Sequence, residues 1–202
     1  MVIFYQQTYN SFCSEMNIFK KMYTGAMNTK QIIIDAAFSI FENKNFKRIT
    51  VQDILNKADV SRATFYKYFS GKHELMHLYY RTYMDRNIEE NYNGNNWREI
   101  AENLLAYIQN NQPYFTNVKD TLGQDSFWDF IWNYSYDFYS SVKQHNEKRD
   151  HLTENERLTI ISHLHGGLAL LKMFIEGKVN MSSGEFAELI CSTIPDSYQE
   201  YK

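Results

Sequence analysis

The stretch from Thr50 to Leu75 constrains the fold of this chain more than any other part of the sequence. Thr50 precedes an apolar-periodic run and Asp53 follows three residues later, a spacing that approximates a helix capping box. Asp59 stands at a turn position, where it tolerates a left-handed backbone, and Ser61 is suited to cap a second helix. The stretch therefore predicts two short helices, a tight turn between them and the start of a third.

The second of these helices would carry a solvent face suited to DNA. Phe65 and Phe69 are four residues apart and can be buried together. The exposed positions then offer cations, hydroxyl groups and rings, and in a major groove Arg reads guanine while hydroxyls bind phosphate. An ordinary solvated helix in a bundle would show the same spacing. The positions expected to contact DNA are Thr50, Ser61, Arg62, Ala63, Thr64, Tyr66, Lys67, Tyr68 and Lys72.

The order of residues in this stretch resembles the DNA-binding domain of the TetR/AcrR family of bacterial repressors. The family pattern is a Thr cap, an Ile-Ala core pair, an Ala-Gly-Val-Ser turn, a Tyr-x-Tyr/His-Phe helix and a Lys-x-Glu-Leu start. Asp59 and Ala63 depart from it, because both stand where the family favours Gly. The matching positions are Thr50, Ile54, Ala58, Asp59, Val60, Ser61, Phe65, Tyr66, Tyr68, Phe69, Lys72, Glu74 and Leu75.

The resemblance implies an all-α protein that binds double-stranded DNA as a homodimer. We expect an N-terminal extension of uncertain order (1–26), a three-helix helix-turn-helix DNA-binding domain (27–72) and a helical effector-binding and dimerisation domain (73–202). Two recognition helices would enter major grooves about 34–36 Å apart on a near-palindromic operator. Repression, relieved by an effector, is favoured over activation.

Within the recognition region, the resemblance and the residue types together divide the expected contacts. Base edges are assigned to Arg62, Thr64 and Lys67. Contacts that bind phosphate or position the helix are assigned to Thr50, Ser61, Tyr66, Tyr68 and Lys72.

Charge and composition agree with a basic head on an acidic body. The chain has a net charge of −3, but from Asn28 to Lys72 eight Lys and Arg outnumber four acids. An apolar share of 44% supplies a core, and two Pro with eight Gly favour helices. Cys13 and Cys191 make no disulfide framework, no apolar run reaches the ~18 residues of a membrane span, and no secretory signal is evident. We therefore expect a cytoplasmic protein without a membrane segment.

Two helix boundaries near the head carry specific expectations. Asn28 or Thr29 would cap a first helix that ends near Lys44, with Asn45 as a left-handed residue after it. Gly71 would cap the helix that links head and body, and Glu74 would complete its capping box.

The aromatic-rich helix from about 124 to 143 is expected at the centre of the body. Trp128, Trp132 and Tyr136 share a face by four-residue spacing and are the candidates to line a pocket for a small apolar or aromatic effector. A packed core accounts for the same rings. The last two helices are amphipathic and fit a two-fold four-helix interface. Its candidate residues are Leu164, Gly166, Gly167, Leu168, Leu171, Phe186, Leu189 and Ile190.

The segment from His73 to His77 matches H-E-x-x-H, which on a helix can hold zinc beside a Glu base. The match is short, no third ligand is identifiable, and the linking helix already explains Glu74. We therefore expect no metal, no cofactor and no catalytic residue. Three alternatives stay open: a zinc-dependent hydrolase using this segment, a protein-interaction module built on a helix-turn-helix, and a co-regulator that answers to a protein partner.

Overall fold

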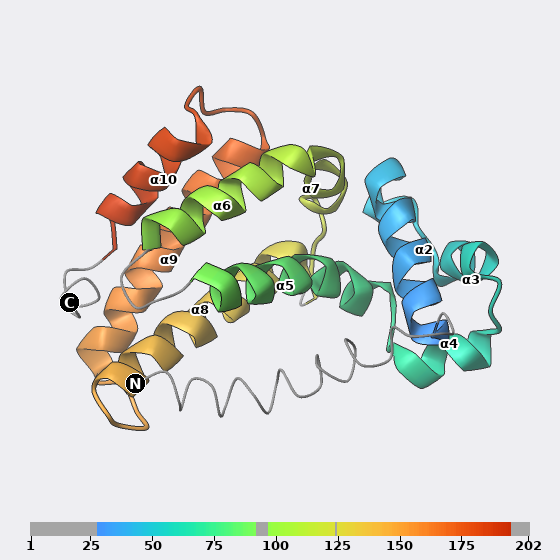
Figure 1. The fold of residues 1–202 in the computed structure, drawn as a ribbon, viewed down its shortest axis with the longest axis horizontal. Helices are drawn as coiled ribbons and strands as arrows, with labels where there is room; N and C mark the ends of the chain where they lie inside the picture. Colours follow the sequence, from blue (N-terminus) through green and yellow to red (C-terminus); the bar gives the residue numbers. More distant parts are fainter. Residues whose placement is uncertain (1–27, 92–96, 124, 195–202) are drawn as a thin grey trace.

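The computed structural model describes residues 28–91, 97–123 and 125–194 of the 202-residue chain. These ranges hold nine α-helices and one 3-10 helix and contain no strand (Figure 1). The predicted all-α fold class is therefore confirmed. The N-terminal extension expected at 1–26 lies outside the described residues.

Three short helices and one 3-10 turn form a head at one end of the molecule (Figure 1). The Thr50–Asp53 capping box is present, because the Thr50 backbone N–H donates to Asp53 Oδ2 at 2.7 Å and Asp53 N donates to Thr50 Oγ1 at 3.2 Å. Asp59 follows with φ of 51°, the predicted left-handed turn. The head elements are α2 (Thr29–Asn43), η1 (Phe46–Arg48), α3 (Val51–Ala58) and α4 (Arg62–Tyr68).

The prediction that Asn45 ends the first helix in a left-handed conformation is wrong. Asn45 has φ of −55°, and its Oδ1 accepts a hydrogen bond from Lys47 N at 3.1 Å, so it begins η1 instead. The last carbonyls of α2 are bound from the body, where Asn117 Nδ2 donates to Phe41 O at 3.0 Å and to Glu42 O at 3.2 Å. The side chain of Asn117 thus provides hydrogen bonds to the end of the helix that a local left-handed turn was expected to provide.

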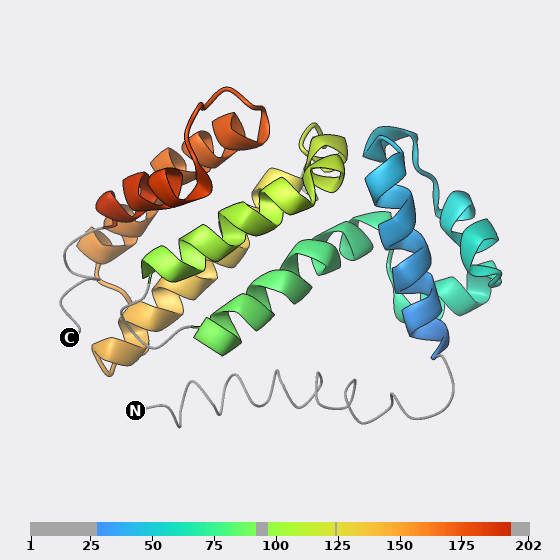
Figure 2. The same ribbon diagram turned by 45° about the horizontal axis from the view of Figure 1, so that its top comes forward.

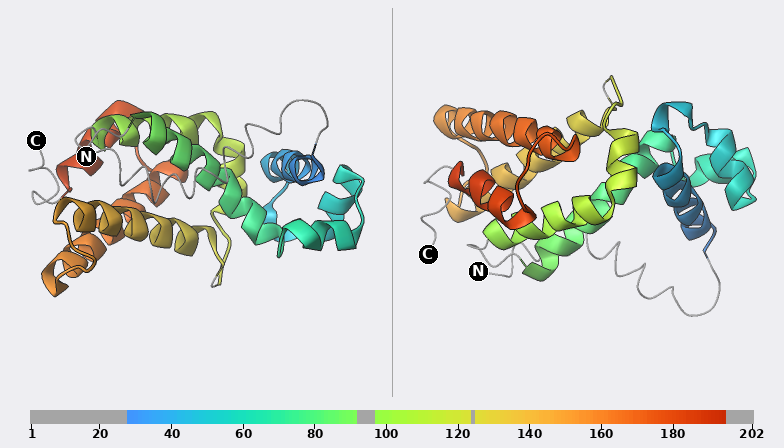
Figure 3. Two further views of the ribbon diagram at one scale, coloured as in Figure 1. Left: turned by 60° about the horizontal axis from the view of Figure 1, so that its bottom comes forward. Right: turned by 90° about the horizontal axis from the view of Figure 1, so that it is seen from above.

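The body is a layered helical bundle. One long helix, α5, connects it to the head and runs along the other helices of the body (Figures 1 and 2). α10 packs on α6, α9 packs on α8, and α7 lies against α2 of the head (Figure 3). The body helices are α5 (Lys72–Asn91), α6 (Trp97–Asn110), α7 (Gln112–Val118), α8 (Phe127–Asn146), α9 (Glu154–Ile175) and α10 (Ser183–Ser192).

One hydrophobic cluster runs without interruption from the head into the body. At the boundary the fully buried Tyr114 ring stacks on Tyr79 at 4.0 Å between centroids and lies 6.5 Å from the Phe41 ring. The Tyr114 hydroxyl donates to Met76 O at 2.6 Å, and burial raises its pKa well above the ordinary value. We name the contacts of α2 with Tyr79, Tyr114 and Asn117 the head–body seam.

The capping box of α3 makes stability depend on pH. Hydrogen bonds from Thr50, with help from Lys44 at 3.1 Å, lower the pKa of Asp53 to about 2. A lowered folded-state pKa means that the stabilisation is complete above the ordinary value near 4 and is lost as pH falls toward 2. We expect urea unfolding to show Asp53→Asn less stable than wild type at pH 7, by about 0.5–1 kcal/mol for this partly exposed cap. The difference should shrink below pH 4.

Asp35→Asn is the control, because it removes an exposed carboxylate from α2 and leaves the capping box intact. A difference between wild type and Asp53→Asn that is as large at pH 3 as at pH 7 would show that ionised Asp53 does not stabilise the head.

Candidate nucleic-acid interface

α4 turns one face into the head and the other to solvent. Phe65 is fully buried and Phe69 is 3% exposed, so the predicted apolar pair anchors the inner face. The Tyr66 ring is 49% exposed on the outer face. The exposed side chains of the helix are Arg62, Ala63, Tyr66 and Lys67, while Thr64 and Tyr68 are half-buried. The helix thus offers two cations and a phenol on one outer surface.

Two hydroxyl groups fix the start of α4. Ser61 Oγ accepts a hydrogen bond from Thr64 N at 3.1 Å, which caps the helix as predicted. The Ser61 and Thr64 hydroxyls also share a hydrogen bond of 2.8 Å. The Thr64 hydroxyl, expected to reach a base edge, is therefore engaged with its cap in this structure.

Sequence reasoning missed Gln52 of α3. Arg62 Nη2 donates to Gln52 Oε1 at 3.3 Å, and Gln52 Nε2 donates to Asn56 Oδ1 at 2.8 Å. All three side chains are exposed. The i,i+4 spacing of Gln52 and Asn56 could have indicated their mutual contact. The contact with Arg62 depends on how α3 packs against α4, which no sequence spacing reveals.

Lys72 lies where η1 meets the start of α5. Its Nζ donates to Phe46 O at 2.9 Å and to Ile49 O at 2.6 Å, and it lies 4.4 Å from the centroid of the Phe46 ring. Burial lowers the pKa of this ammonium group. Lys72 therefore ties η1 to α5, and its expected contact with phosphate stays a prediction.

Elements of the head other than α4 also carry exposed cations. Lys47, Arg48 and Lys57 are exposed, and Lys57 Nζ donates to Ser39 Oγ at 2.8 Å. Lys67 Nζ lies 5.7 Å from the centroid of the Tyr68 ring. Such a concentration of positive charge is what attraction to a phosphate backbone requires.

The H-E-x-x-H segment is used for packing and capping. His73 lies edge-on to Phe46 with centroids 5.0 Å apart, and Glu74 Oε2 accepts from Ser70 N at 2.7 Å and Ser70 Oγ at 2.9 Å. The predicted partner of Glu74, the N–H of Gly71, is thus replaced by that of Ser70.

The second histidine of the segment is held by the body. His77 Nε2 lies 3.2 Å from Asp125 O, and its ring stacks on Phe130 at 4.3 Å. Burial lowers the pKa of His73 and of His77. Among the described residues, no group of three His, Cys, Asp or Glu is placed to hold a metal ion. The zinc-hydrolase alternative is therefore not supported by the positions of these side chains.

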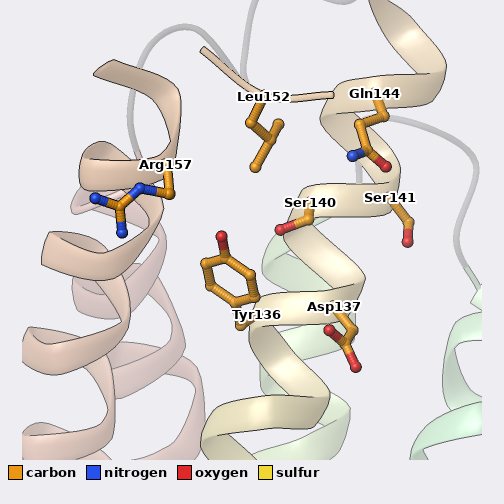
Figure 4. Close-up of a pocket in the computed structure, with 7 residues that line it drawn as sticks. All are labelled: Tyr136, Asp137, Ser140, Ser141, Gln144, Leu152 and Arg157. Carbon is orange, nitrogen blue, oxygen red and sulfur yellow. The ribbon is translucent and has the colours of Figure 1, made fainter. Parts of the chain in front are cut away.

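The three predicted pocket residues have different surroundings. Trp128 Nε1 donates to Lys119 O at 2.8 Å, and Trp132 stacks on Tyr136 with centroids 5.2 Å apart. Only Tyr136 of the three lines the pocket that opens between α8 and α9 (Figure 4). Binding of an apolar effector by these rings stays a prediction.

The predicted dimer residues divide into two sets. Leu164 and Leu171 are 4% and 5% exposed and Phe186 is fully buried, stacked on Phe174 at 4.9 Å, so all three pack inside the protomer. Gly166 and Leu189 are exposed, whereas Gly167, Leu168 and Ile190 are intermediate.

α9 presents an outer stripe of small and apolar residues. Its members recur every three or four positions and are all exposed; Leu158 is 50% and Met173 41% exposed. A Cβ placed on Gly166 would meet nothing within 4 Å. Among the described helices, α9 alone is long and apolar enough to cross a membrane, and 33% of that window is buried. We name this the α9 stripe: Leu158, Ser162, Gly166, Ala169 and Met173.

Two family models match the chain. The model for bacterial regulatory proteins of the tetR family matches residues 33–78, which cover most of the head and the start of α5. The model for a transcriptional regulator C-terminal region matches residues 95–196, about half of the chain.

Named relatives agree with these models. The HTH-type dhaKLM operon transcriptional activator DhaS of Lactococcus lactis subsp. lactis is 28% identical over 90 residues, which are 45% of this chain and 48% of that protein. The HTH-type transcriptional regulator YfiR of Bacillus subtilis is 24% identical over 95 residues, 47% of this chain and 46% of that protein. The chain thus matches about half the length of these curated relatives.

A solved structure supports the fold. The crystal structure of a TetR transcriptional regulator from Streptococcus agalactiae is 17% identical, with a TM-score of 0.59, and the match covers 91% of this chain and 98% of that one. Regulators of this family are DNA-binding transcription factors and not enzymes. The two family models together span the head and the body, and the chain therefore belongs to the TetR family of bacterial transcriptional regulators.

Proposed function

We propose that this protein binds a near-palindromic operator as a homodimer in the cytoplasm and represses transcription until an effector releases it. The single observation that supports this most is the outer face of α4, where two cations and a phenol stand exposed at the tip of a basic head. Membership of the TetR family supports DNA binding. The operator, the homodimer and the effector are part of the proposal.

In this proposal α4 enters the major groove. Arg62 has a fork of donors that suits the O6 and N7 acceptors of guanine, and Lys67 reaches a neighbouring base edge. Tyr66, exposed beside them, and Ser61, at the start of the helix, would bind phosphate and set the register. Thr64 would contact a base only after its hydroxyl turns from Ser61.

The proposed homodimer rests on the α9 stripe. Its small residues would let the backbone of a second α9 approach closely, and Leu158 and Met173 would gain burial. Leu189 on α10 is 38% exposed and would extend the contact. Of the residues predicted from the sequence, Gly166 and Leu189 are exposed and belong to this proposed interface. Leu164, Leu171 and Phe186 do not, because they are buried in the protomer.

Signal transfer would pass through the head–body seam. Tyr79 on α5 donates to Glu42 Oε1 of the head at 3.3 Å and to Asn111 Oδ1 of the body at 3.0 Å. An effector that favours another packing of α7 would change the angle of α2 and hence the separation of the two recognition helices. The effector acts by its preference for one of two packings, which is a population shift.

The sign of regulation is tested separately from DNA binding. The relative DhaS is named an activator, whereas we propose repression here. Transcription in vitro should fall when the protein is added to a promoter that carries an operator selected from random DNA for binding to this protein. A rise would keep the DNA-binding proposal and reverse its sign.

One prediction of this proposal concerns the recognition helix. Selection of bound sites from random DNA should yield a near-palindrome with half-sites one helical turn apart. Arg62→Ala should cost about 1–3 kcal/mol and relax the preference at one base position. The control for Arg62→Ala is a body variant, Lys178→Ala, which removes an exposed charge far from α4.

The measurement is the binding constant on matched and mismatched operators across a salt series. Lys178→Ala should leave both affinity and preference unchanged. If Arg62→Ala keeps the wild-type affinity and the wild-type base preference, then α4 does not read the operator as proposed.

The second prediction concerns the α9 stripe. Ala169→Glu should place a charge in the apolar contact between protomers without disturbing the protomer core, because Ala169 is exposed. We expect light scattering after size exclusion to show a dimer for the wild type and a monomer for the variant. Operator binding should weaken, because the two heads then bind independently.

Asn133→Glu is the matched control, since it adds the same charge at an exposed position of α8 outside the stripe. The control should remain dimeric. A dimeric Ala169→Glu, or a wild type that is monomeric at micromolar concentration, would contradict the proposed interface.

A further inference from the structure

Two side chains of α3 form a line of hydrogen bonds with the first residue of α4. Gln52 Nε2 donates to Asn56 Oδ1 at 2.8 Å, and Gln52 Oε1 accepts from Arg62 Nη2 at 3.3 Å. All three side chains are exposed, and α3 and α4 lie on the side of the head that is away from the body (Figure 1). The two helices thus share one polar, solvent-exposed surface.

The orientation of the Gln52 amide follows from its two neighbours. A guanidinium group has donors only, so Gln52 must turn its oxygen toward Arg62. Its NH2 group then points the other way and needs an acceptor, which Asn56 Oδ1 supplies from one helical turn away. Asn56 therefore holds Gln52 in the orientation that suits Arg62.

Both residues of the contact between the helices stand on fixed backbone. Gln52 is the second residue of α3, whose start is held by its capping box. Arg62 is the first residue of α4, whose start is held by the hydrogen bond from Thr64 N to Ser61 Oγ. The freedom that remains in Arg62 is that of its long side chain. The hydrogen bond to Gln52 restricts this freedom before DNA arrives, which reduces the cost of binding.

The contact leaves a pair of Arg62 donors available for a base. Nη2 carries two hydrogens, and the bond to Gln52 Oε1 uses one of them. Whichever hydrogen is used, the other lies parallel to an N–H of Nε or of Nη1, so two parallel donors remain. Guanine presents O6 and N7 as acceptors to such a pair. Gln52 can therefore hold Arg62 while Arg62 binds a guanine.

The partner of Arg62 is also neutral. A carboxylate in place of the Gln52 amide would form an ion pair with the guanidinium and would repel the DNA phosphates. The carboxylate next in sequence, that of Asp53, is held by the Thr50 N–H at 2.7 Å and by Lys44 Nζ at 3.1 Å. Gln52 thus restrains Arg62 without reducing the positive charge that attracts DNA.

We infer, on the basis of the proposed function in which Arg62 reads a base edge, that Gln52 is a positioning residue for this readout. It orients the guanidinium of Arg62 toward the base and acts through Arg62 alone. The base preference at one position of the operator then depends on a residue of the helix that precedes the recognition helix.

A double-mutant cycle on base preference tests this role, with the full-length protein and the operator selected from random DNA. Binding constants are measured for the wild type, Gln52→Ala, Arg62→Ala and the double variant, on this operator and on operators changed at single base pairs in both half-sites. Gln52→Ala should reduce the preference about three- to tenfold, the effect of one hydrogen bond, at the base pair where Arg62→Ala reduces it. The double variant should show the same preference as Arg62→Ala, because Gln52 acts through Arg62.

Gln31→Ala is the matched control. Gln31 makes a similar i,i+4 contact on α2, another helix of the head, where its Nε2 donates to Asp35 Oδ1 at 2.8 Å. Its replacement should keep the wild-type preference at every base pair. Circular dichroism should show every variant folded.

The possible results separate the role of Gln52 from the proposed function. If Arg62→Ala loses base preference and Gln52→Ala keeps it, even with weaker binding to every sequence, then Gln52 does not position Arg62 and the proposed function stands. If Gln52→Ala loses preference at another base pair, and its effect adds to that of Arg62→Ala, then Gln52 contacts DNA itself and the positioning role is wrong. If Arg62→Ala keeps the wild-type preference, then α4 does not read the operator as proposed and the role of Gln52 fails with it.

Discussion

The contact between α2 and the body is the constraint on which the rest of the structure depends. The C-terminal carbonyls of α2 are bound by Asn117, and the Tyr114 ring fills the space between Phe41 and Tyr79. Because this seam combines a helix cap with fully buried rings, head and body share one core rather than meeting at a loose linker. A head placed this way has a defined orientation, which the proposed binding of two half-sites at a fixed spacing requires.

The linking helix α5 is held by both sides of the seam. At its start Lys72 binds two carbonyls of the head, and His73 packs against Phe46. One turn later His77 stacks on Phe130 of α8 and contacts the backbone of Asp125. Residues that resemble a zinc motif in the sequence thus serve as the two attachments of the helix, one to the head and one to the body.

The opposite end of the body is arranged differently. α9 buries one face against α8 and leaves the α9 stripe exposed, so a helix long and apolar enough to cross a membrane is only partly covered within one protomer. A second copy is the proposed cover. The polar pocket lies between this helix and α8, and it is lined by residues that do not belong to the α9 stripe.

Elements whose signals are local could be predicted from the order of residues alone. The capping box at Thr50, the left-handed Asp59, the Ser61 cap and the buried Phe65–Phe69 pair all depend on residues within four positions of one another. For the same reason the all-α class and the family resemblance could be predicted from the stretch that begins the head. The α4 face was predictable in part, because helical periodicity separates the exposed Arg62, Tyr66 and Lys67 from the buried Phe65, whereas Thr64 and Tyr68 are half-buried.

Contacts between residues that are distant in the chain depend on how the helices pack, and no local pattern predicts them. Asn117 caps α2 from more than seventy residues away, which removed the need for a left-handed Asn45. The packing of α3 on α4 brought Gln52 to Arg62, and the packing of α9 on α8 decided which of its apolar residues remain exposed. Periodicity identifies the apolar positions of a helix, but the packing of its neighbours decides which of those positions are buried.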